Sequence, residues 1–262
     1  MKPSAFLGSL NRLPLWQRPV RVWDFRLTPP TFDRWLYLWM HRLHRMGGKD
    51  RTFFRQVIRP GMHVADVGAN LGLYSLMFAQ LVGPEGHVYA FEPDELMVRY
   101  LRANLAANGV AHAEVFACAV GAGAGRAFLQ RHAVNSGDNR LGTAATALHC
   151  DQASVEVCAL QDALRGRRVD FIKMDLQGWD GEALRGISGL LDANPALQIC
   201  FEFWPHGLNL AGTTLPGLAE TLRHLGLRVS LAEPGPAATP VDIETLAPKM
   251  KPGTWVNLLA TR

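Results

Sequence analysis

The chain has 262 residues, 48% of them hydrophobic, with 25 glycines and a formal net charge of +4. This composition excludes a disordered chain and leaves room for one large α/β domain with an extension. No run approaches the roughly eighteen apolar residues of a membrane span, and the start from Met1 to Ser4 does not lead into the long apolar core of a secretory signal.

Residues 1–49 form a basic segment that is rich in tryptophan. They hold nine Lys or Arg against Asp24 and Asp33, a balance of +7, which leaves −3 for the rest of the chain. Apolar residues recur at helical spacing from Phe32 to Leu43, which predicts an amphipathic helix over Asp33 to Met46 that packs on the core or on a second subunit. A role at a membrane surface, an anionic substrate or a nucleic acid stays open as the alternative.

We expect residues 1–50 to be a helical extension, and past it strands and helices alternate along residues 51–262. The hydrophobic pattern predicts strands over Val64 to Val67, His87 to Phe91, Glu114 to Val120, Asp170 to Met174, Gln198 to Phe203, Arg228 to Ala232 and Trp255 to Ala260. It predicts helices over Tyr74 to Leu81, Glu95 to Asn108, Gly181 to Asp192 and Leu215 to Leu225. The alternation indicates a mainly parallel sheet covered on both faces. The Pro- and Ala-rich link from Glu233 to Pro240 favours an antiparallel final strand, because a parallel crossover usually needs a helix.

A long segment, about residues 121–168, breaks the alternation of strands and helices between the third and fourth predicted core strands. It contains two further strand candidates, Arg126 to Gln130 and Val155 to Leu160, and a polar stretch from Asn135 to Arg140. Because a long insertion at the ligand-bearing edge of a sheet is usually functional or disordered, we interpret this one as functional.

The turn after the first strand carries the strongest functional signal. The run Asp66-Val-Gly68-Ala-Asn70-Leu-Gly72 links a strand to a helix, and Glu92 ends the next strand. Gly68 and Gly72 lack the Cβ that would hold a ligand away, and the amides at the helix start are hydrogen-bond donors. A carboxylate at the position of Glu92 can accept both ribose hydroxyls of a nucleotide-like cofactor.

The letters of this turn favour S-adenosylmethionine over a dinucleotide. The dinucleotide pattern G-x-G-x-x-G needs a glycine where Asn70 stands. A carboxylate at the strand tip, Asp66, suits the cationic amino-acid end of the methyl donor better than it suits a pyrophosphate. A nicotinamide-dependent dehydrogenase remains the alternative from another enzyme class.

The cysteines Cys118, Cys150, Cys158 and Cys200 lack the spacing of a metal site. Cys118 and Cys200 fall inside apolar predicted strands. We interpret the four as reduced thiols of a cytoplasmic protein.

Five motifs occur in a fixed order along the chain: Asp66-Val-Gly-Ala-Asn-Leu-Gly-Leu-Tyr-Ser75, Phe91-Glu-Pro93, Asn104, Leu160-Gln-Asp-Ala-Leu164 and Ile172-Lys-Met-Asp-Leu-Gln-Gly178. Together they resemble the FkbM-type methyltransferases, a branch of the class I S-adenosylmethionine-dependent enzymes, over about residues 50–205. The resemblance implies an α/β fold, the class I methyltransferase Rossmann-like seven-stranded sheet of order 3-2-1-4-5-7-6 with an antiparallel last strand. It also implies methyl transfer to a hydroxyl oxygen of a small molecule, such as a sugar or a natural-product scaffold. The family commonly has Glu where Gln177 and Asp180 stand, so a role that needs a carboxylate at position 177 is not carried over.

The resemblance assigns a cofactor site position by position. The backbone from Gly68 to Gly72 and the side chain of Asn70 would hold the methionine part of the donor. Asp66 would serve its ammonium through water, and Glu92 its ribose. The adenine edge would fall near Ala117 to Val120, where Cys118 lies.

Methyl transfer to an alcohol also needs a group that removes the hydroxyl proton. Asp175, Glu202 and His206 follow or end central strands, where ligands bind in α/β sheets, and are the candidate catalytic residues. Each has a structural interpretation as well: Asp175 as a helix cap, Glu202 as a buried carboxylate paired with an arginine, and His206 as a loop histidine. We interpret Asp180 and Glu182 as first-turn acids that face a helix dipole.

Asp175 and Glu202 could offer oxygen ligands to Mg²⁺, but no third ligand has matching spacing, so a metal site is not favoured. Nucleic-acid methylation is not favoured either, since the fourth strand ends Asp-Leu-Gln-Gly and not in an Asn-Pro-Pro-aromatic turn. The sequence therefore predicts an O-methyltransferase with a small-molecule acceptor. Homo-oligomer formation and peripheral membrane contact through residues 1–49 stay open. A non-catalytic S-adenosylmethionine-binding subunit is the third hypothesis, favoured if Asp175, Glu202 and His206 face away from the cleft.

Overall fold

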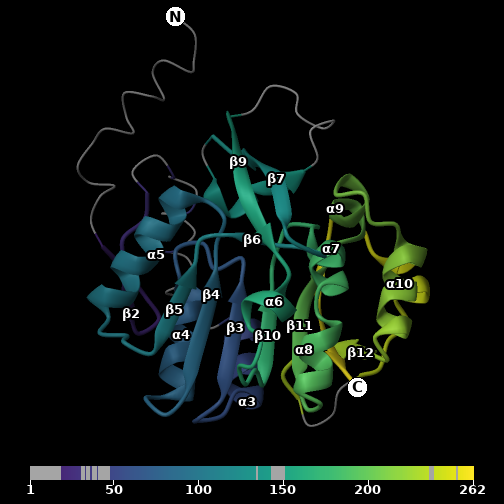
Figure 1. Ribbon diagram of the computed structural model, residues 1–262, viewed down its shortest axis with the longest axis horizontal. Helices are drawn as coiled ribbons and strands as arrows, with labels where there is room; N and C mark the ends of the chain where they lie inside the picture. Colours follow the sequence, from purple (N-terminus) through teal and green to yellow (C-terminus); the bar gives the residue numbers. More distant parts are fainter. Residues whose placement is uncertain are drawn as a thin grey trace, which may run out of the picture.

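The computed structural model in Figure 1 describes residues 19–30, 33, 36, 40, 48–133, 135–142, 151–235, 239–251 and 253–262. Seven strands form its main sheet: β3 (His63–Val67), β4 (His87–Phe91), β5 (Ala113–Phe116), β10 (Phe171–Met174), β11 (Gln198–Phe203), β12 (Arg228–Leu231) and β13 (Val256–Thr261). Their order across the sheet is β12-β13-β11-β10-β3-β4-β5. Numbered along the chain within this sheet, the order read from β5 is 3-2-1-4-5-7-6, and β13 is antiparallel to both of its neighbours, as expected.

Helices cover both faces of this sheet (Figure 1). The first face packs against α3 (Lys49–Val57), α4 (Leu73–Val82), α5 (Glu95–Ala107) and the hairpin of β1 (Val20–Val22) and β2 (Phe25–Leu27). The second face packs against α6 (Leu160–Ala163), α7 (Asp180–Arg185), α8 (Ser188–Ala193), α9 (Pro205–Leu210), α10 (Leu215–His224) and α11 (Ile243–Leu246), which the 3-10 turn Ala247–Lys249 follows. The alternation of strands and helices in the sequence therefore predicted the layered architecture.

The strands distribute their side chains between the two faces with a period of two. In β3, Val64 belongs to the core under α4 and Ala65 to the core on the other face. In β10, Phe171 lies on the α4 face and Ile172 on the other. Because successive strand residues point to opposite faces, Lys173 shares the α4 face with Phe171.

Two predicted elements are divided in the structure, and both predictions were wrong for the same reason. The predicted strand Glu114 to Val120 is two strands, β5 and β6 (Ala119–Val120), because β6 leaves the main sheet and pairs with β9 (Asp151–Cys158). The predicted helix Gly181 to Asp192 is two helices, α7 and α8. A Cβ at Gly186, between them, would lie 2.3 Å from the carbonyl oxygen of Gly121. In both places the insertion contacts the core at the point where the predicted element is divided.

The insertion forms a second sheet of order β6-β9-β7-β8. Its other strands are β7 (Gly125–Arg131) and β8 (Arg140–Gly142), and the polar stretch between them contains a 3-10 turn, Ser136–Asp138. The predicted strand Val155 to Leu160 instead ends at Cys158, with Leu160 in α6. In Figure 1 this small sheet lies above the edge of the main sheet where the strands β3, β4 and β10 end.

The hairpin β1–β2 was not predicted, although it is part of the first-face core. Val22 and Leu27 are fully buried there. Trp23, at its turn, has a positive φ of 53° and packs edge-on against Tyr74. Of the predicted helix Asp33 to Met46, the structure describes Asp33, Leu36 and Met40, and the rest of that prediction lies outside the described residues.

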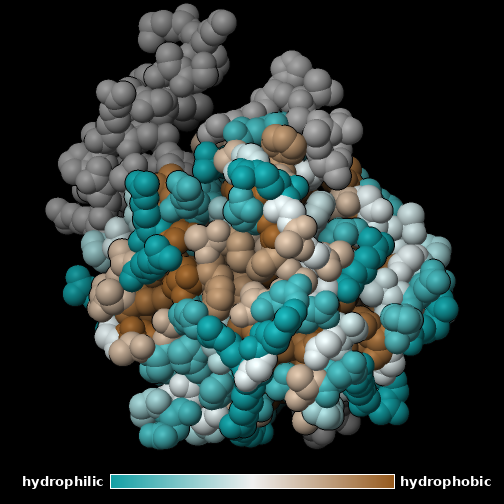
Figure 2. All heavy atoms as spheres, viewed as in Figure 1, coloured by the Kyte–Doolittle hydropathy of each residue, from teal (hydrophilic) through white to brown (hydrophobic). Residues whose placement is uncertain are grey.

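Among the described residues, no helix is long and apolar enough to cross a membrane. Figure 2 shows hydrophilic side chains around the periphery of one face, with apolar side chains gathered left of centre, below the small sheet. Among the large apolar side chains that the structure describes, Leu210 and Trp255 are the most exposed, at 52% each.

Candidate functional site

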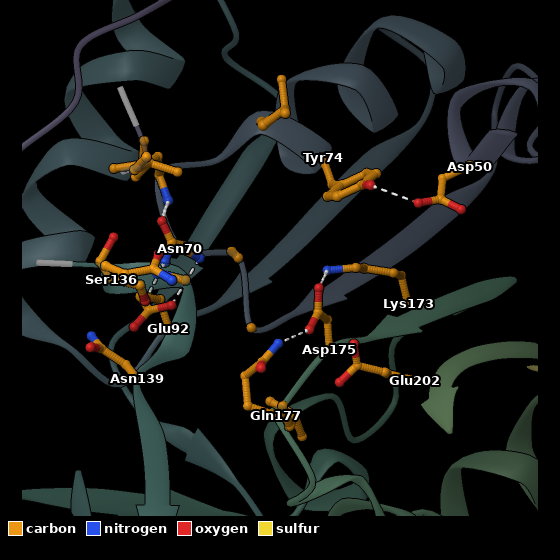
Figure 3. A pocket seen from close by; sticks show the side chains of 18 of the residues that line it. Asp50, Asn70, Tyr74, Glu92, Ser136, Asn139, Lys173, Asp175, Gln177 and Glu202 are labelled. Carbon is orange, nitrogen blue, oxygen red and sulfur yellow. Dashed lines mark hydrogen bonds and ion pairs between the residues drawn. The ribbon is translucent and has the colours of Figure 1, made fainter. Parts of the chain in front are cut away.

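A cavity of about 560 Å³ lies at the carboxyl ends of β3, β4, β10 and β11. This volume is within the range of roughly 300–1,000 Å³ that is typical of small-molecule sites. Figure 3 shows Asn70, Glu92 and Ser136 on one side of it and Lys173, Asp175, Gln177 and Glu202 on the other. The parallel strands bring these groups together because their carboxyl ends meet at one edge of the sheet.

The two glycines of the turn serve the packing of the protein itself. Gly68 has a φ of +83°, and a Cβ there would lie 2.2 Å from the backbone oxygen of Asp175. Gly72 has a φ of +89°, and its Cβ would lie 2.5 Å from Leu101 Cδ1. Gly68 lines the cavity, whereas Gly72 is absent from the described lining. At both positions an added Cβ would therefore meet protein atoms, and the expectation that these glycines leave room for a ligand stays a prediction.

Asn70 and Glu92 form one wall of the cavity. Asn70 adopts a positive φ of 49°, which Asn tolerates better than most residues, and its backbone N–H donates to Glu92 Oε2 at 2.8 Å. Glu92 Oε1 accepts from the N–H of Asp94 at 2.9 Å. Burial raises the pKa of Glu92 to about 7, although these two backbone donors oppose the rise. Each carboxylate oxygen keeps a further lone pair for a ligand hydroxyl.

The insertion and the N-terminal segment close over this wall. Asn70 Nδ2 donates to the carbonyl of Ser136 at 3.1 Å. The N–H of Ser136 donates to Asp33, whose other oxygen accepts from the N–H of Leu36 at 2.8 Å. Asp33 is 1% exposed, and Leu36 and Met40 line the cavity beside it. One chain of hydrogen bonds therefore links the extension, the insertion and the glycine turn.

A buried lysine, Lys173, lies between two carboxylates at the centre of the site. Its Nζ is 3.3 Å from Asp175 Oδ2 and 3.7 Å from Asp66 Oδ1, and it lies 4.7 Å from the centre of the Tyr74 ring. Burial lowers the pKa of Lys173, but Asp175 and Asp66 outweigh burial and raise it above its ordinary value. Lys173 is therefore a fixed cation in the cavity wall.

Asp66 lies behind the cavity wall and is fully buried. It accepts from Ser75 Oγ at 2.6 Å and pairs with Lys173, and burial raises its pKa because these partners compensate only in part. It is absent from the described lining of the cavity. In the structure Asp66 pairs with Lys173. From the sequence, Asp66 was instead assigned to the ammonium of the ligand.

Asp175 faces the cavity, and Gln177 holds it there. Gln177 Nε2 donates to Asp175 Oδ1 at 2.9 Å, and Gln177 has a positive φ of 52°. A carboxylate at position 177 could not make this hydrogen bond unless it were protonated. Nearby, Tyr74 donates to Asp50 at 3.3 Å, and Asn257 donates to the other oxygen of Asp50 at 3.3 Å.

Glu202 and Asp180 are buried acids. Glu202 is 7% exposed and lines the cavity, and burial, followed by the charges of Asp175 and Asp180, raises its pKa to about 9. Burial, followed by Asp175, raises the pKa of Asp180 to about 7. Neither Glu202 Oε2 nor the two oxygens of Asp180 has a side-chain partner among the described residues. Glu202 is thus a protonated acid at neutral pH, and no described arginine pairs with it as its structural interpretation supposed. The first-turn position of Asp180 in α7 is as predicted, but its side chain is fully buried.

Two sequence candidates lie elsewhere. His206 is exposed in α9 and packs edge-on against Trp204, and neither His206 nor Cys118 belongs to the described lining of the cavity. Cys150 lies outside the described residues. Within the part of the chain that the structure describes, no three His, Cys, Asp or Glu side chains are grouped so as to hold a metal ion.

Comparison with known families identifies the chain. Residues 66–226 match the model of the methyltransferase FkbM domain, which is more than half of the sequence. The chain belongs to the FkbM methyltransferase family. The family is one of S-adenosylmethionine-dependent methyltransferases, and the chain has the class I methyltransferase fold of β3–β13 described above.

Similar proteins of known name match this FkbM family member over short segments. The 31-O-demethyl-FK506 methyltransferase FkbM of Streptomyces tacrolimicus is 42% identical over 85 residues, which is 32% of each chain. The protein-L-isoaspartate O-methyltransferase of Methanothrix thermoacetophila is 44% identical over 48 residues, 18% of this chain and 23% of that protein. The chain thus matches a third or less of the length of these relatives.

Solved structures of methyltransferases resemble the chain over most of its length. A SAM-dependent methyltransferase from Aquifex aeolicus has a TM-score of 0.44 at 18% sequence identity. The match covers 99% of this chain and 97% of the Aquifex chain. A SAM-dependent O-methyltransferase from Thermotoga maritima has a TM-score of 0.47 at 16% sequence identity. The match covers 94% of this chain and 77% of the Thermotoga chain.

Sequence reasoning missed Lys173, Tyr74 and Asp50 as members of the site. A signal for Lys173 was available: a lysine inside the apolar strand Phe171–Met174 must be buried, and a buried cation needs charged partners. Tyr74 and Asp50 carried no such signal, because they lie on two helices that only the tertiary structure brings to β10.

Proposed function

We propose that this protein is an S-adenosylmethionine-dependent O-methyltransferase that acts on a hydroxyl of a small molecule, a sugar or a natural-product scaffold. The observation that carries the proposal is the position of Asp175. It lies in the same cavity as Glu92, is held by Lys173 at 3.3 Å and by Gln177 at 2.9 Å, and faces the space between them. Family membership supports the methyl donor over the nicotinamide alternative.

Glu92, Asn70 and the backbone from Gly68 to Leu71 would hold the donor. Glu92 is the ribose ligand in this proposal, since it lines the cavity at the end of β4. Bound S-adenosylmethionine would supply a methyl group that is already activated by its sulfonium. The residues of this chain then need to bind the acceptor hydroxyl in line with that methyl group and remove its proton.

Asp175 is the proposed base, because it faces the cavity as an acceptor of hydrogen bonds. Lys173, fixed as a cation beside it, would stabilise negative charge that develops on the acceptor oxygen. Glu202, whose pKa burial raises to about 9, is protonated at neutral pH and would donate a hydrogen bond to the acceptor. His206, exposed outside the cavity lining, is the third candidate and the least supported by position.

The charge of the cavity supports an acceptor without phosphate groups. Its described lining contains the acids Asp50, Glu92 and Asp175, the protonated acid Glu202, and a single cation, Lys173, which pairs with Asp66 and Asp175. A phosphorylated acceptor or a nucleic-acid backbone would face repulsion there. A cytoplasmic location fits the free thiols Cys118, Cys158 and Cys200. Homo-oligomer formation and membrane-surface contact through residues 1–49 stay hypotheses.

The test combines donor binding with turnover. Release of S-adenosylhomocysteine is measured against a panel of hydroxylated small molecules for the intact protein, Asp175→Asn, Glu202→Gln and His206→Ala. We expect Asp175→Asn to lower kcat by about 10² to 10⁴, the usual contribution of general-base catalysis. Its donor affinity, measured by calorimetry, should change little. His206→Ala tests the third candidate in the same assay, and Glu220→Gln, at an exposed position of α10, serves as the control outside the cavity.

Full turnover by Asp175→Asn would overturn its role as the base. Loss of activity in a chelator, restored by Mg²⁺, would instead make Asp175 and Glu202 metal ligands. Binding of a nicotinamide nucleotide in place of S-adenosylmethionine would overturn the proposed reaction itself.

A further inference from the structure

Two cysteines from distant parts of the sequence meet where the insertion joins the core. Cys118 follows β5, and Cys158 is the last residue of β9. Their Sγ atoms are 2.9 Å apart. That separation exceeds the S–S bond length of about 2.05 Å by roughly 0.9 Å, so a small side-chain movement would bring the two sulfurs to bonding distance.

The backbone around the pair is already held together. Val120 pairs with Cys158 in the parallel ladder of β6 and β9, and the N–H of Gly121 donates to the carbonyl of Cys158 at 2.9 Å. The two strands therefore stay side by side whether or not their sulfurs are bonded. A bond between the sulfurs would close a loop that contains all four strands of the small sheet, β6 to β9.

The environment of the two thiols suits exchange with a small disulfide. Both side chains are half-buried and within reach of solvent, whereas Cys200 is 1% exposed. The hydrogen bond that the two thiols share lowers the pKa of the Cys158 thiol and raises that of the Cys118 thiol. Since the thiolate is the nucleophile in exchange, Cys158 would attack first and Cys118 would resolve.

We propose that Cys118 and Cys158 are a redox-active pair that closes reversibly into an intramolecular disulfide by exchange with a small-molecule disulfide such as oxidised glutathione. The thiolate of Cys158 attacks one sulfur of that disulfide, and one small thiol leaves. Cys118 then loses its proton and attacks Cys158 Sγ, and the second small thiol leaves. Two protein thiols are oxidised and one small disulfide is reduced to two thiols. This site does not depend on the proposed methyl transfer.

The experiment uses the full-length protein with its four cysteines. The reduced protein is equilibrated in glutathione buffers of increasing oxidised fraction, quenched with an alkylating agent, and analysed by thiol counting and peptide mass spectrometry. We expect the count to fall from four thiols to two, with a Cys118–Cys158 cross-link, and to return to four after treatment with dithiothreitol. Cys118→Ser and Cys158→Ser should each prevent this cross-link, and Cys200→Ser should not.

Circular dichroism of the serine variants checks that they are folded, so that a missing cross-link reflects the loss of the thiol and not unfolding. Retention of four thiols at every oxidised fraction, a persistent glutathione adduct on Cys158, or a cross-link that involves Cys150 or Cys200 would each overturn the proposal.

Discussion

At the scale of single residues, Lys173 connects stability to the site. It is 6% exposed and pairs with Asp66, opposite it on the neighbouring strand β3, and with Asp175, which directly follows its own strand β10. Removal of one partner from a buried ion pair typically costs about 3 to 5 kcal/mol, because the other charge is left uncompensated. We therefore expect Lys173→Met to lower the free energy of unfolding by about that amount, measured by urea titration.

Lys49, an exposed lysine at the start of α3, provides the matched control: Lys49→Met should leave stability almost unchanged. Asp66→Asn in the Lys173→Met background should restore part of the loss, since it removes one of the two unpaired carboxylates. Equal stability of Lys173→Met and the intact protein would show that Lys173 is not needed to balance Asp66.

Glu92 gives the sharpest test of donor binding. Glu92→Gln keeps the size of the side chain but removes its charge, and hydrogen bonds to charged groups contribute roughly 1.5 to 3 kcal/mol. We expect affinity for S-adenosylmethionine, measured by calorimetry, to fall about ten- to 150-fold. Glu95→Gln changes an exposed acid in the first turn of α5 and should leave affinity unaltered. Unchanged affinity in Glu92→Gln would remove Glu92 from the donor site.

At the scale of elements, Asp94 joins the insertion to α5. It caps the helix by accepting from the N–H of Leu96 at 3.0 Å. It also accepts two hydrogen bonds from Arg131 at 3.0 Å and one from Asn139 at 3.3 Å. The same buried carboxylate thus fixes a helix start and the small sheet above the cavity.

Two substitutions separate these roles of Asp94. Asp94→Ser retains a capping oxygen and loses the ion pair with Arg131, whereas Asp94→Ala loses both. We expect the Ala variant to be less stable than the Ser variant by about 1 kcal/mol, the usual cost of a lost N-cap. Both should be cleaved faster within the insertion in limited proteolysis. Resistance equal to that of the intact protein would mean that Asp94 does not hold the small sheet.

At the scale of the whole molecule, buried acids make stability depend on pH. Burial raises the pKa of Asp180 from 3.8 to about 7, that of Glu92 from 4.5 to about 7 and that of Glu202 from 4.5 to about 9. The folded protein therefore keeps protons that the unfolded chain has lost, so stability falls as pH rises. The stabilisation that these protonated acids contribute to the folded protein is fully present below about pH 4. It is lost as the pH rises through about 7 and then through about 9.

We expect the free energy of unfolding to decrease between pH 6 and 9, with a slope of at most about 1.4 kcal/mol per pH unit for each group. Asp180→Asn should flatten the lower part of this dependence and Glu202→Gln the upper part. Glu220→Gln, at an exposed position of α10, should leave the profile unchanged. A profile that is flat in the intact protein, or that rises with pH, would contradict the burial of these charges.

The order of the strands and helices and the turn from Asp66 to Gly72 could be predicted from the sequence. Both are local properties: strands alternate with helices at readable periods, and Asp66 to Gly72 and Glu92 lie within one βαβ unit, so their separation along the chain fixes their place at one sheet edge. Asp175 and Glu202 follow the same rule, because the carboxyl end of each parallel strand points to that edge. The sequence by itself therefore determined the sheet, the family and the presence of Gly68, Asn70, Glu92, Asp175 and Glu202 at the cavity.

Tertiary structure decided which atoms fill the space around these residues. Gly68 is needed because the backbone of Asp175 passes 2.2 Å from the position of its Cβ, and Asp66 binds Lys173 because β3 and β10 pair in that register. Likewise, β6 leaves the main sheet because β9 returns to pair with it, and Cys118 meets Cys158 forty residues later. Such contacts depend on register and packing between segments far apart in the chain, and no local pattern of residues records them.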